Sequence, residues 1–354
     1  VVTFGYTILQ ILSLILTKNY FVYLLIKLIA TVAMNMYFYV KSYKAYPYLK
    51  EKETIPLTDE YIKNLVKNVK ALFMMSISSF LVFSTDNMLI TYFVGLAAVA
   101  VYSNYSTIIS MVNQTFNTAI SSMKSNVGNY LVTEGEEDRY KLFKRIFFAN
   151  FLITGFTSVA LITLTNEFIG GIWLGNKFVW PFVLLIILVF NNFSRYMSEA
   201  AGVMLSGAGM YSPYPFYKYW SLTEGIVNIV ASLFMIKVLN MGVYGVFLGT
   251  SVSTLVTTIV VPHAAFKYIL KRNLVEYFKL YFKYAMLTIL FASISVLIFK
   301  AFYTQNSFLN IVIGCVSSIG VMGVGTVLFL GRSDEFRYVF QMIKGFMKKR
   351  GTEK

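Results

Sequence analysis

Long apolar runs separated by short polar segments constrain the fold of this chain more than any other feature. Most runs are about 20 residues or longer, enough for a helix to cross a hydrocarbon core of roughly 30 Å. Backbone groups in lipid must be hydrogen-bonded within their own segment, so we expect helices rather than an open sheet. The runs lie near 1–16, 20–40, 70–95, 97–123, 146–168, 179–207, 220–240, 243–266, 284–302 and 307–330. The sequence therefore predicts an all-α polytopic membrane protein with about ten transmembrane helices.

Lys and Arg are divided unevenly between the two sides that this topology creates. Of the 31 cationic residues, 25 fall in segments expected on one face, namely 41–70, 124–145, 208–219, 267–283 and 331–354. The opposite face holds four: Lys18, Lys177, Lys237 and Lys300. Positive charge is retained in the cytoplasm during insertion, so we expect the rich face and the C-terminus to be cytoplasmic. The net charge of +15 follows from this topology, so we expect contact with anionic lipid headgroups and no nucleic-acid partner.

The polar segments divide the chain into six expected parts. In chain order they are a helical pair, a cytoplasmic linker between two helical lobes, a six-helix lobe, a basic cytoplasmic loop, two accessory lipid-facing helices and a basic cytoplasmic tail, at 1–40, 41–69, 70–266, 267–283, 284–330 and 331–354. The chain opens at Val1 inside an apolar run, so we expect an amino-terminal part to be missing. With one cysteine and one histidine, it can form neither an internal disulfide nor a multi-histidine metal site.

Five charged side chains within the apolar runs are candidates for a functional role, because a charge at membrane depth costs roughly 2.5–3.5 kcal/mol and usually faces a cavity or a partner. They are Lys27, Asp86, Arg195, Glu199 and Glu224. Arg195 and Glu199 are spaced to meet at i,i+4 on one helical stripe that also carries Asn192. The pair either fixes helix packing or offers Arg195 to an anionic substrate while Glu199 holds it in the empty state. Arg suits phosphate because its planar fork donates two parallel hydrogen bonds.

The run 97–123 and the residues just after it carry uncharged polar side chains on one helical face, at steps of three and four. They are Ser103, Ser106, Ser110, Gln114, Asn117, Ser121 and Ser125. Seven such residues are more than helix–helix contacts need. We therefore favour a face that lines water or a sugar over a packed polar interface.

Asp86, Glu224 and Asn228 form a second group of candidates. Two separated acids with amide and hydroxyl oxygens nearby are the ingredients of a Na⁺ or H⁺ coupling site. The alternative is that each is a hydrogen-bonded packing residue. Lys27 is expected to extend toward an interface. Gly242, Gly245 and Gly249, at steps of three and four, are expected to let two helices approach closely.

Several motifs of other protein classes are missing from the sequence. It has no Gly-rich phosphate loop for ATP, no interfacial Asp-x-Asp pair for a metal and a nucleotide sugar, and no large outer loop with clustered Arg and His. We therefore expect binding and release rather than catalysis, and no cofactor beyond possible coupling to an ion gradient.

A set of short motifs carries a family resemblance over roughly residues 1–270. They are Tyr46-Pro47-Tyr48-Leu49-Lys50, Ser84-Thr85-Asp86-Asn87, Val94-Gly95-Leu96, Val101-Tyr102-Ser103-Asn104-Tyr105, Lys144-Arg145-Ile146-Phe147-Phe148, Ile172-Trp173-Leu174-Gly175, Glu224-Gly225-Ile226-Val227-Asn228 and Gly249-Thr250-Ser251-Val252-Ser253-Thr254. In their order and spacing the chain resembles the Wzx-type polysaccharide flippases of the multidrug/oligosaccharidyl-lipid/polysaccharide exporter superfamily.

The resemblance implies two six-helix lobes around a central cavity, followed by two extra helices. Residues 1–40 would be the last two helices of the first lobe, whose first four are absent, and 70–266 the whole second lobe. It implies that polyprenyl-diphosphate-linked oligosaccharide crosses the bacterial cytoplasmic membrane by alternating access, with polysaccharide polymerase machinery as a possible partner. Arg195 would meet the diphosphate, and Asp86, Glu224 and Asn228 would be candidates for the coupling ion.

Three other functions stay open at this point. A cation-coupled drug antiporter of the same superfamily would have an acid-dominated cavity, whereas the polar face here is rich in hydroxyls and amides and has an Arg. A membrane polysaccharide polymerase or ligase would need a large outer loop with catalytic Arg or His. A non-transporting scaffold would not need a charged interior.

Overall fold

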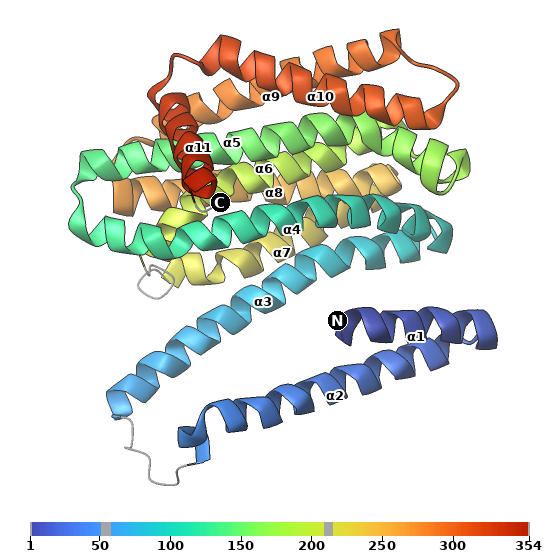
Figure 1. Cartoon of the computed structure of the whole chain (residues 1–354), viewed down its shortest axis with the longest axis horizontal. Helices are drawn as coiled ribbons and strands as arrows, with labels where there is room; N and C mark the ends of the chain where they lie inside the picture. Colours follow the sequence, from blue (N-terminus) through green and yellow to red (C-terminus); the bar gives the residue numbers. More distant parts are fainter. Residues whose placement is uncertain (1, 51–57, 209–214, 353–354) are drawn as a thin grey trace. The chain divides into compact units, whose positions relative to one another are not determined.

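The structure is a computed structural model that describes residues 2–50, 58–208 and 215–352 (Figure 1). Every regular element in these ranges is a helix, which agrees with the all-α prediction. The chain forms two compact units, residues 1–63 and 64–354.

The first unit is a helical hairpin. Helix α1 (Val2–Thr17) and helix α2 (Tyr20–Ala45) are joined at Lys18 and Asn19, and the Asn19 side chain caps α2 by accepting from the backbone N–H of Phe21. Gln10 of α1 donates to the carbonyl of Tyr23, with 3.3 Å between the two atoms. A 3₁₀ turn at Pro47–Lys50 follows, and α3 (Asp59–Phe93) begins in this unit and continues into the second.

The second unit is a bundle with α5 near its middle. Its further helices are α4 (Leu96–Thr133), α5 (Glu136–Glu167), α6 (Phe182–Gly207), α7 (Pro215–Lys237), α8 (Val243–Ala265), α9 (Leu274–Ala301), α10 (Ser307–Leu330) and α11 (Asp334–Thr352). α6 packs against α5 and α8, and α8 also packs against α7. α9 and α10 pack on the side of α5 away from α6, and α11 crosses over α5 (Figure 1).

Five helices are long and apolar enough to cross a membrane. Among the described residues these are Tyr20–Ala45, Glu136–Trp173, Val243–Leu270, Leu274–Ala301 and Ser307–Leu330, judged by length and composition. The other expected spans are also helical, but the polar stripes of α4 and α6 lower their mean hydropathy. These further spans, and with them a total of about ten, stay a prediction.

Helices continue into segments that were expected as loops. α4 runs to Thr133 and α5 begins at Glu136, so only two residues separate them. The expected loop 267–283 contains a π-helical turn, Phe266–Leu270, and the start of α9, and the expected tail contains α11. A polar segment can stay helical beyond the apolar core because its side chains point into water while the backbone bonds are kept.

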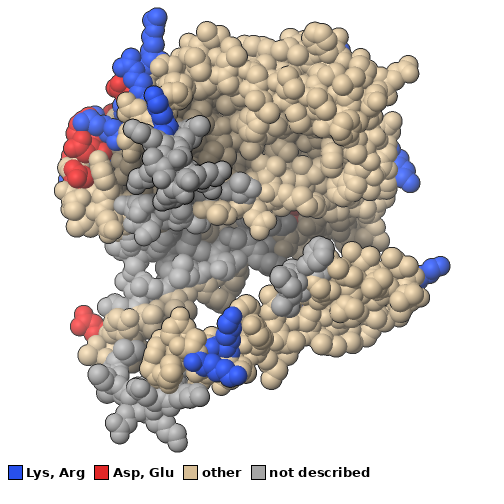
Figure 2. Space-filling view, viewed as in Figure 1, with Lys and Arg blue, Asp and Glu red and all other residues tan. Residues whose placement is uncertain are grey.

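Charged side chains gather at one end of the second unit, while the surface over α9 and α10 is nearly free of charge (Figure 2). At this end the α4–α5 junction is joined to the α8–α9 junction by the ion pair of Lys271 with Glu136, whose Nζ and Oε1 are 2.6 Å apart, and by that of Arg272 with Glu137. Lys144 of α5 pairs with Glu335 of α11 at 3.3 Å. We call this the inner end and the opposite end, with the α5–α6 junction, the outer end.

The sequence predicted that α9 and α10 are lipid-facing, but one face of each helix is buried. The hydroxyls of Thr163 and Ser295 are 3.0 Å apart, and Ser295 reaches Ser317 and Ser318 of α10 at 3.2 and 3.3 Å. All four side chains are buried. Small polar residues therefore join α5 to α9 and α9 to α10, and the mean hydropathy of these helices gives no sign of these contacts.

Glycines let α7 and α8 approach closely, as predicted. A Cβ on Gly249 would lie 2.5 Å from the backbone nitrogen of Ser232, and one on Gly245 would lie 3.0 Å from that of Ile236. Gly242 has a different role, because it precedes the first turn of α8 with a φ of +54°.

We expect Gly249→Ala to lower the free energy of unfolding by roughly 1–3 kcal/mol, because the added methyl group forces α7 and α8 apart. Gly323→Ala is the matched control, since nothing lies within 4 Å of a Cβ at that position in α10. Thermal unfolding in detergent measures both. Equal unfolding temperatures for the two variants would contradict the close contact.

Candidate functional site

A polar cavity of about 130 Å³ lies among α3, α4, α6 and α8 of the second unit. Its lining combines one carboxylate, one guanidinium, hydroxyls, amides and aromatic rings. The lining residues are Asp86, Tyr102, Ser106, Ile109, Ser110, Asn113, Leu188, Asn191, Asn192, Arg195, Tyr196, Phe247, Thr250 and Thr254. Opposite charges and neutral donors in one cavity can bind a ligand that has both charged and hydroxyl groups.

Arg195 pairs with Glu224 of α7, which corrects the expected i,i+4 pair with Glu199. Arg195 Nη2 and Glu224 Oε1 are 2.9 Å apart, and the Glu224 side chain is 9% exposed. The Glu199 carboxylate instead lies over its own helix, 3.3 Å from where a Cβ on Gly202 would be. A partner on a neighbouring helix prevails because α6 and α7 both pack against α8, which brings their polar faces together.

Asp86 and Asn228 are linked through Thr250 of α8. The Asn228 amide donates to Thr250 Oγ1 over 3.0 Å, and the Thr250 hydroxyl lies 3.1 and 3.2 Å from the two carboxylate oxygens of Asp86. Asp86 is 5% exposed and Asn228 is fully buried. The structure therefore brings two of the three ion-coupling candidates into one hydrogen-bonded chain, while the third, Glu224, is paired with Arg195.

Three acceptor oxygens near this chain have no hydrogen-bond partner among the described residues. They are Asn191 Oδ1, Asn228 Oδ1 and Thr254 Oγ1. Buried acceptors without a donor carry a desolvation cost unless water or an ion satisfies them. Oxygen ligands beside a carboxylate are the donor set that hard cations prefer. In the part of the chain that the structure describes, no cluster of three or more His, Cys, Asp or Glu side chains could hold a metal ion.

The polar face of α4 is divided between the cavity and the surface. Ser106 and Ser110 line the cavity. Ser103, Gln114 and Asn117 are exposed and do not line it. Ser121 and Ser125 belong to positions whose side chains lie outside the described residues.

Asn192 of the α6 stripe lines the cavity and accepts a hydrogen bond from Asn113, over 2.8 Å. Seven further polar or aromatic lining residues escaped the sequence prediction: Tyr102, Asn113, Asn191, Tyr196, Phe247, Thr250 and Thr254. Asn113 could have been found, because it lies three residues after Ser110 and fits the helical period of that stripe. Thr250 and Thr254, four residues apart, gave a similar signal on α8.

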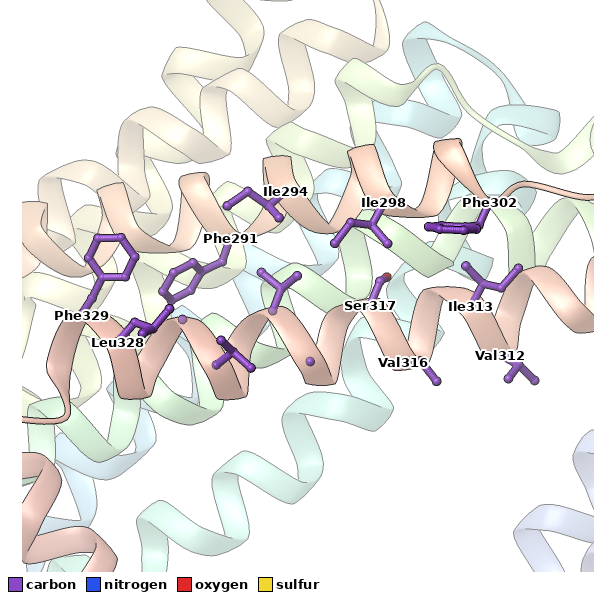
Figure 3. A pocket seen from close by; sticks show the side chains of 14 residues that line it. Phe291, Ile294, Ile298, Phe302, Val312, Ile313, Val316, Ser317, Leu328 and Phe329 are labelled. Atoms are coloured by element: carbon purple, nitrogen blue, oxygen red, sulfur yellow. The ribbon is translucent and has the colours of Figure 1, made fainter.

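A second, larger cavity has no charged or amide side chain in its lining. This groove of about 640 Å³ lies between α9 and α10, and Figure 3 shows apolar side chains from both helices facing it. Its lining has one hydroxyl, that of Ser317, which also donates to the carbonyl of Gly314 over 3.0 Å. The polar cavity is therefore the candidate functional site.

Comparison with known protein families, with curated proteins and with solved structures finds no match. The fold and the site define a helical protein with several candidate membrane spans and a charged, hydroxyl-rich cavity. The resemblance to polysaccharide flippases stays a prediction.

We expect Glu224→Gln to lower the free energy of unfolding by roughly 1–3 kcal/mol, because it leaves Arg195 in the bundle without this counter-charge. Combining it with Arg195→Gln should recover part of that loss, since no charge is then left unpaired. Unfolding of the two single variants and the double variant measures the coupling energy.

Asp138→Asn is the control for this cycle. Asp138 pairs with Lys141, but both side chains are about half exposed. Such a pair contributes at most about 1 kcal/mol. Additive effects of the Arg195 and Glu224 substitutions would contradict the ion pair.

Proposed function

We propose that this chain belongs to a flippase that translocates polyprenyl-diphosphate-linked oligosaccharide repeat units for cell-surface polysaccharide synthesis, such as lipopolysaccharide or capsule. The observation that carries the proposal is the position of Arg195 in a cavity with Asn192, Ser106 and Ser110. A diphosphate needs a permanent cation with several donors, and a sugar needs neutral groups that both donate and accept. Binding and release suffice for this function, so it is no enzyme.

The substrate would be held by residues with separate roles. The guanidinium of Arg195 would donate to the diphosphate oxygens, and Asn192, Ser106 and Ser110 would bond to sugar hydroxyls beside it. Ser103, Gln114 and Asn117 would extend this face along exposed parts of α4. Glu199, on the same helix as Arg195, would also contact the substrate, although it does not pair with Arg195.

Glu224 takes over the resetting role first considered for Glu199. Glu224 holds Arg195 through the ion pair of 2.9 Å between Oε1 and Nη2. An arriving diphosphate must compete for the same guanidinium, and Glu224 restores the pair when the diphosphate leaves. Such competition prevents substrate from being held too tightly for release.

A Na⁺ or H⁺ gradient would act through Asp86. With Arg195 and Glu224 paired, the Asp86 carboxylate is the second acid of the cluster, and the unpartnered oxygens of Asn228 and Thr254 are nearby acceptors. A cation or a proton would neutralise it at low cost compared with an unpaired buried charge.

The charge pattern predicts the location of the chain and its orientation in the membrane. The chain would be a multi-pass protein of the bacterial cytoplasmic membrane, with the inner end and the C-terminus in the cytoplasm. α1 and α2 would come from a first lobe, α3–α8 would form the second, and α9 and α10 would be the extra pair. The basic loops and the basic tail would face anionic lipid headgroups. Polysaccharide polymerase machinery would be a partner.

A cation-coupled drug antiporter is the second candidate, favoured by the Asp86–Thr250–Asn228 chain. It accounts less well for Arg195, because a cationic drug would be repelled by a guanidinium. A polymerase or ligase is a weaker alternative, since the polar cavity has no residue pair with an obvious catalytic role.

We expect Arg195→Ala to leave lipid-linked glycan on the inner leaflet in a strain that lacks the native protein, lowering flipping roughly 10- to 100-fold through loss of charge-assisted hydrogen bonds. Arg195→Lys should be intermediate, because a single ammonium cannot bond bidentately. The leaflet distribution of polyprenyl-diphosphate oligosaccharide is the measurement.

Arg332→Ala, at an exposed arginine outside the cavity, is the control and should clear the glycan as the parent does. Full rescue by Arg195→Ala would make Arg195 a packing residue. An unchanged glycan distribution in the strain without the protein would favour the drug antiporter.

We expect Asp86→Asn to remove the dependence of transport on Na⁺ or pH, because the amide cannot bind or release a proton or counter a cation. Transport in vesicles with imposed Na⁺ and pH gradients measures this, with Asp138→Asn as the exposed-carboxylate control. If Asp86→Asn and Glu224→Gln both keep the parent's transport and ion dependence, the coupling assignment is wrong.

A further inference from the structure

The segment between α5 and α6 forms an irregular cover at the outer end of the second unit. α5 passes into a π-helical turn, Phe168–Trp173, and Gly175 then turns the chain with a φ of +93°. A 3₁₀ turn at Asn176–Phe178 follows, and α6 begins just after Trp180. Backbone this irregular in a helical protein is found where it is fixed by specific contacts.

Three hydrogen bonds fix the end of this segment. The Tyr105 hydroxyl donates to Asn166 Oδ1 over 2.7 Å and accepts from the backbone N–H of Trp180 over 2.8 Å. The Asn166 amide donates to the carbonyl of Trp180 over 3.3 Å. Tyr105 is fully buried. These bonds form a closed ring, the latch, which joins α4, α5 and the start of α6.

The latch places the Trp180 ring against two side chains of the polar cavity. Trp180 stacks on Tyr102, with 6.1 Å between ring centroids and 15° between planes, and lies 5.5 Å from Phe247. Tyr102 and Phe247 touch each other at 5.1 Å and both line the cavity. Trp180 also stacks on Tyr105 of the latch at 5.4 Å.

These rings lie toward the outer end of the cavity. At 1.5 Å per residue, Tyr102 and Phe247 lie within about 10 Å of the outer starts of α4 and α8, whereas Arg195 lies about 20 Å along α6. Leu188 of α6 lies at a depth similar to that of Tyr102, so the two rings are among the lining residues nearest the outer end, and Trp180 precedes the first turn of α6 beside them. Rings packed on one another exclude water and solutes from the space behind them.

We propose that Trp180 is the outer seal of the polar cavity, held shut by the Tyr105–Asn166 latch, so that the latch must break before the cavity opens to the outer side. The proposal needs the cavity and a membrane around it, but it does not depend on which solute is carried. It predicts that loss of the seal exposes the cavity to water-soluble reagents from the outer side only.

Thiol labelling tests the seal in intact cells. Cys315, the single cysteine, is replaced by serine, and Ile109→Cys places a reporter in the cavity lining. A membrane-impermeant maleimide added outside should label this reporter slowly. Trp180→Ala should raise the labelling rate about tenfold or more, because it removes all three ring contacts. Tyr105→Phe keeps every ring and removes only the latch hydroxyl, so it should give an intermediate rate.

Trp173→Ala is the matched control. It removes a tryptophan from the same segment whose ring contacts Phe168 and not the cavity lining, so its rate should equal the parent's. Lys177→Cys, exposed on the same segment, reports reagent access and should label fast in every background. Parental rates in both Trp180→Ala and Tyr105→Phe would overturn the seal, as would equal acceleration by Trp173→Ala.

The outcome is separable from the proposed function. If Trp180→Ala exposes the reporter while the leaflet assay shows no stranded glycan, the seal stands and the flippase proposal fails. If glycan is stranded in the strain without the protein but the reporter never responds to Trp180→Ala, the flippase proposal stands and the seal fails.

Discussion

A guanidinium inside an apolar helix bundle needs a counter-charge, and the ion pair of Arg195 with Glu224 supplies it. The turn of α6 around this arginine is fixed from three sides. Asn150 of α5 donates to the carbonyl of Tyr196 over 3.3 Å, Thr258 of α8 donates to that of Ser194 over 3.5 Å, and the hydroxyls of Tyr281 in α9 and Ser194 are 2.9 Å apart. Tyr281 lies in a segment that the sequence predicted as a cytoplasmic loop, so the first part of α9 helps to orient the central charge.

The close contact of α7 and α8 serves the same site. Gly249, which allows this contact, directly precedes Thr250, and Ser232 opposite it lies one turn beyond Asn228. The separation of the two helices thus sets the 3.0 Å bond from Asn228 to Thr250, and through Thr250 the contact with Asp86. The buried hydrogen bonds depend on the small residues, because longer side chains between α7 and α8 would move the Asn228 amide away from Thr250.

Sequence periodicity could predict the helices and most of the charged candidates, but not their partners. The rule of i,i+4 neighbours correctly describes what can meet on one helix, and it suggested Glu199 for Arg195. Glu224 prevails because the rotation and depth of α7 against α6 depend on packing with α8, which a single helix does not encode. Similarly, hydropathy identified α9 and α10 but could not reveal that Ser295 and Ser317 face inward. Their orientation is set by the contact of Ser295 with α5 and of Ser317 with Ser295.

Asp86, Glu224 and Arg195 together have two carboxylates and one guanidinium, so with all three ionised these three groups have one net negative charge. An anion that takes Arg195 from Glu224 leaves two unpaired carboxylates in a poorly solvated space, which is unfavourable unless a cation or a proton arrives as well. Anion binding and cation binding would therefore favour each other without any contact between the two ligands. The effect of each binding event on the other is a coupling free energy, and it is the same in both directions. It arises from the net charge of the three groups and from the guanidinium that Glu224 and the anion would share.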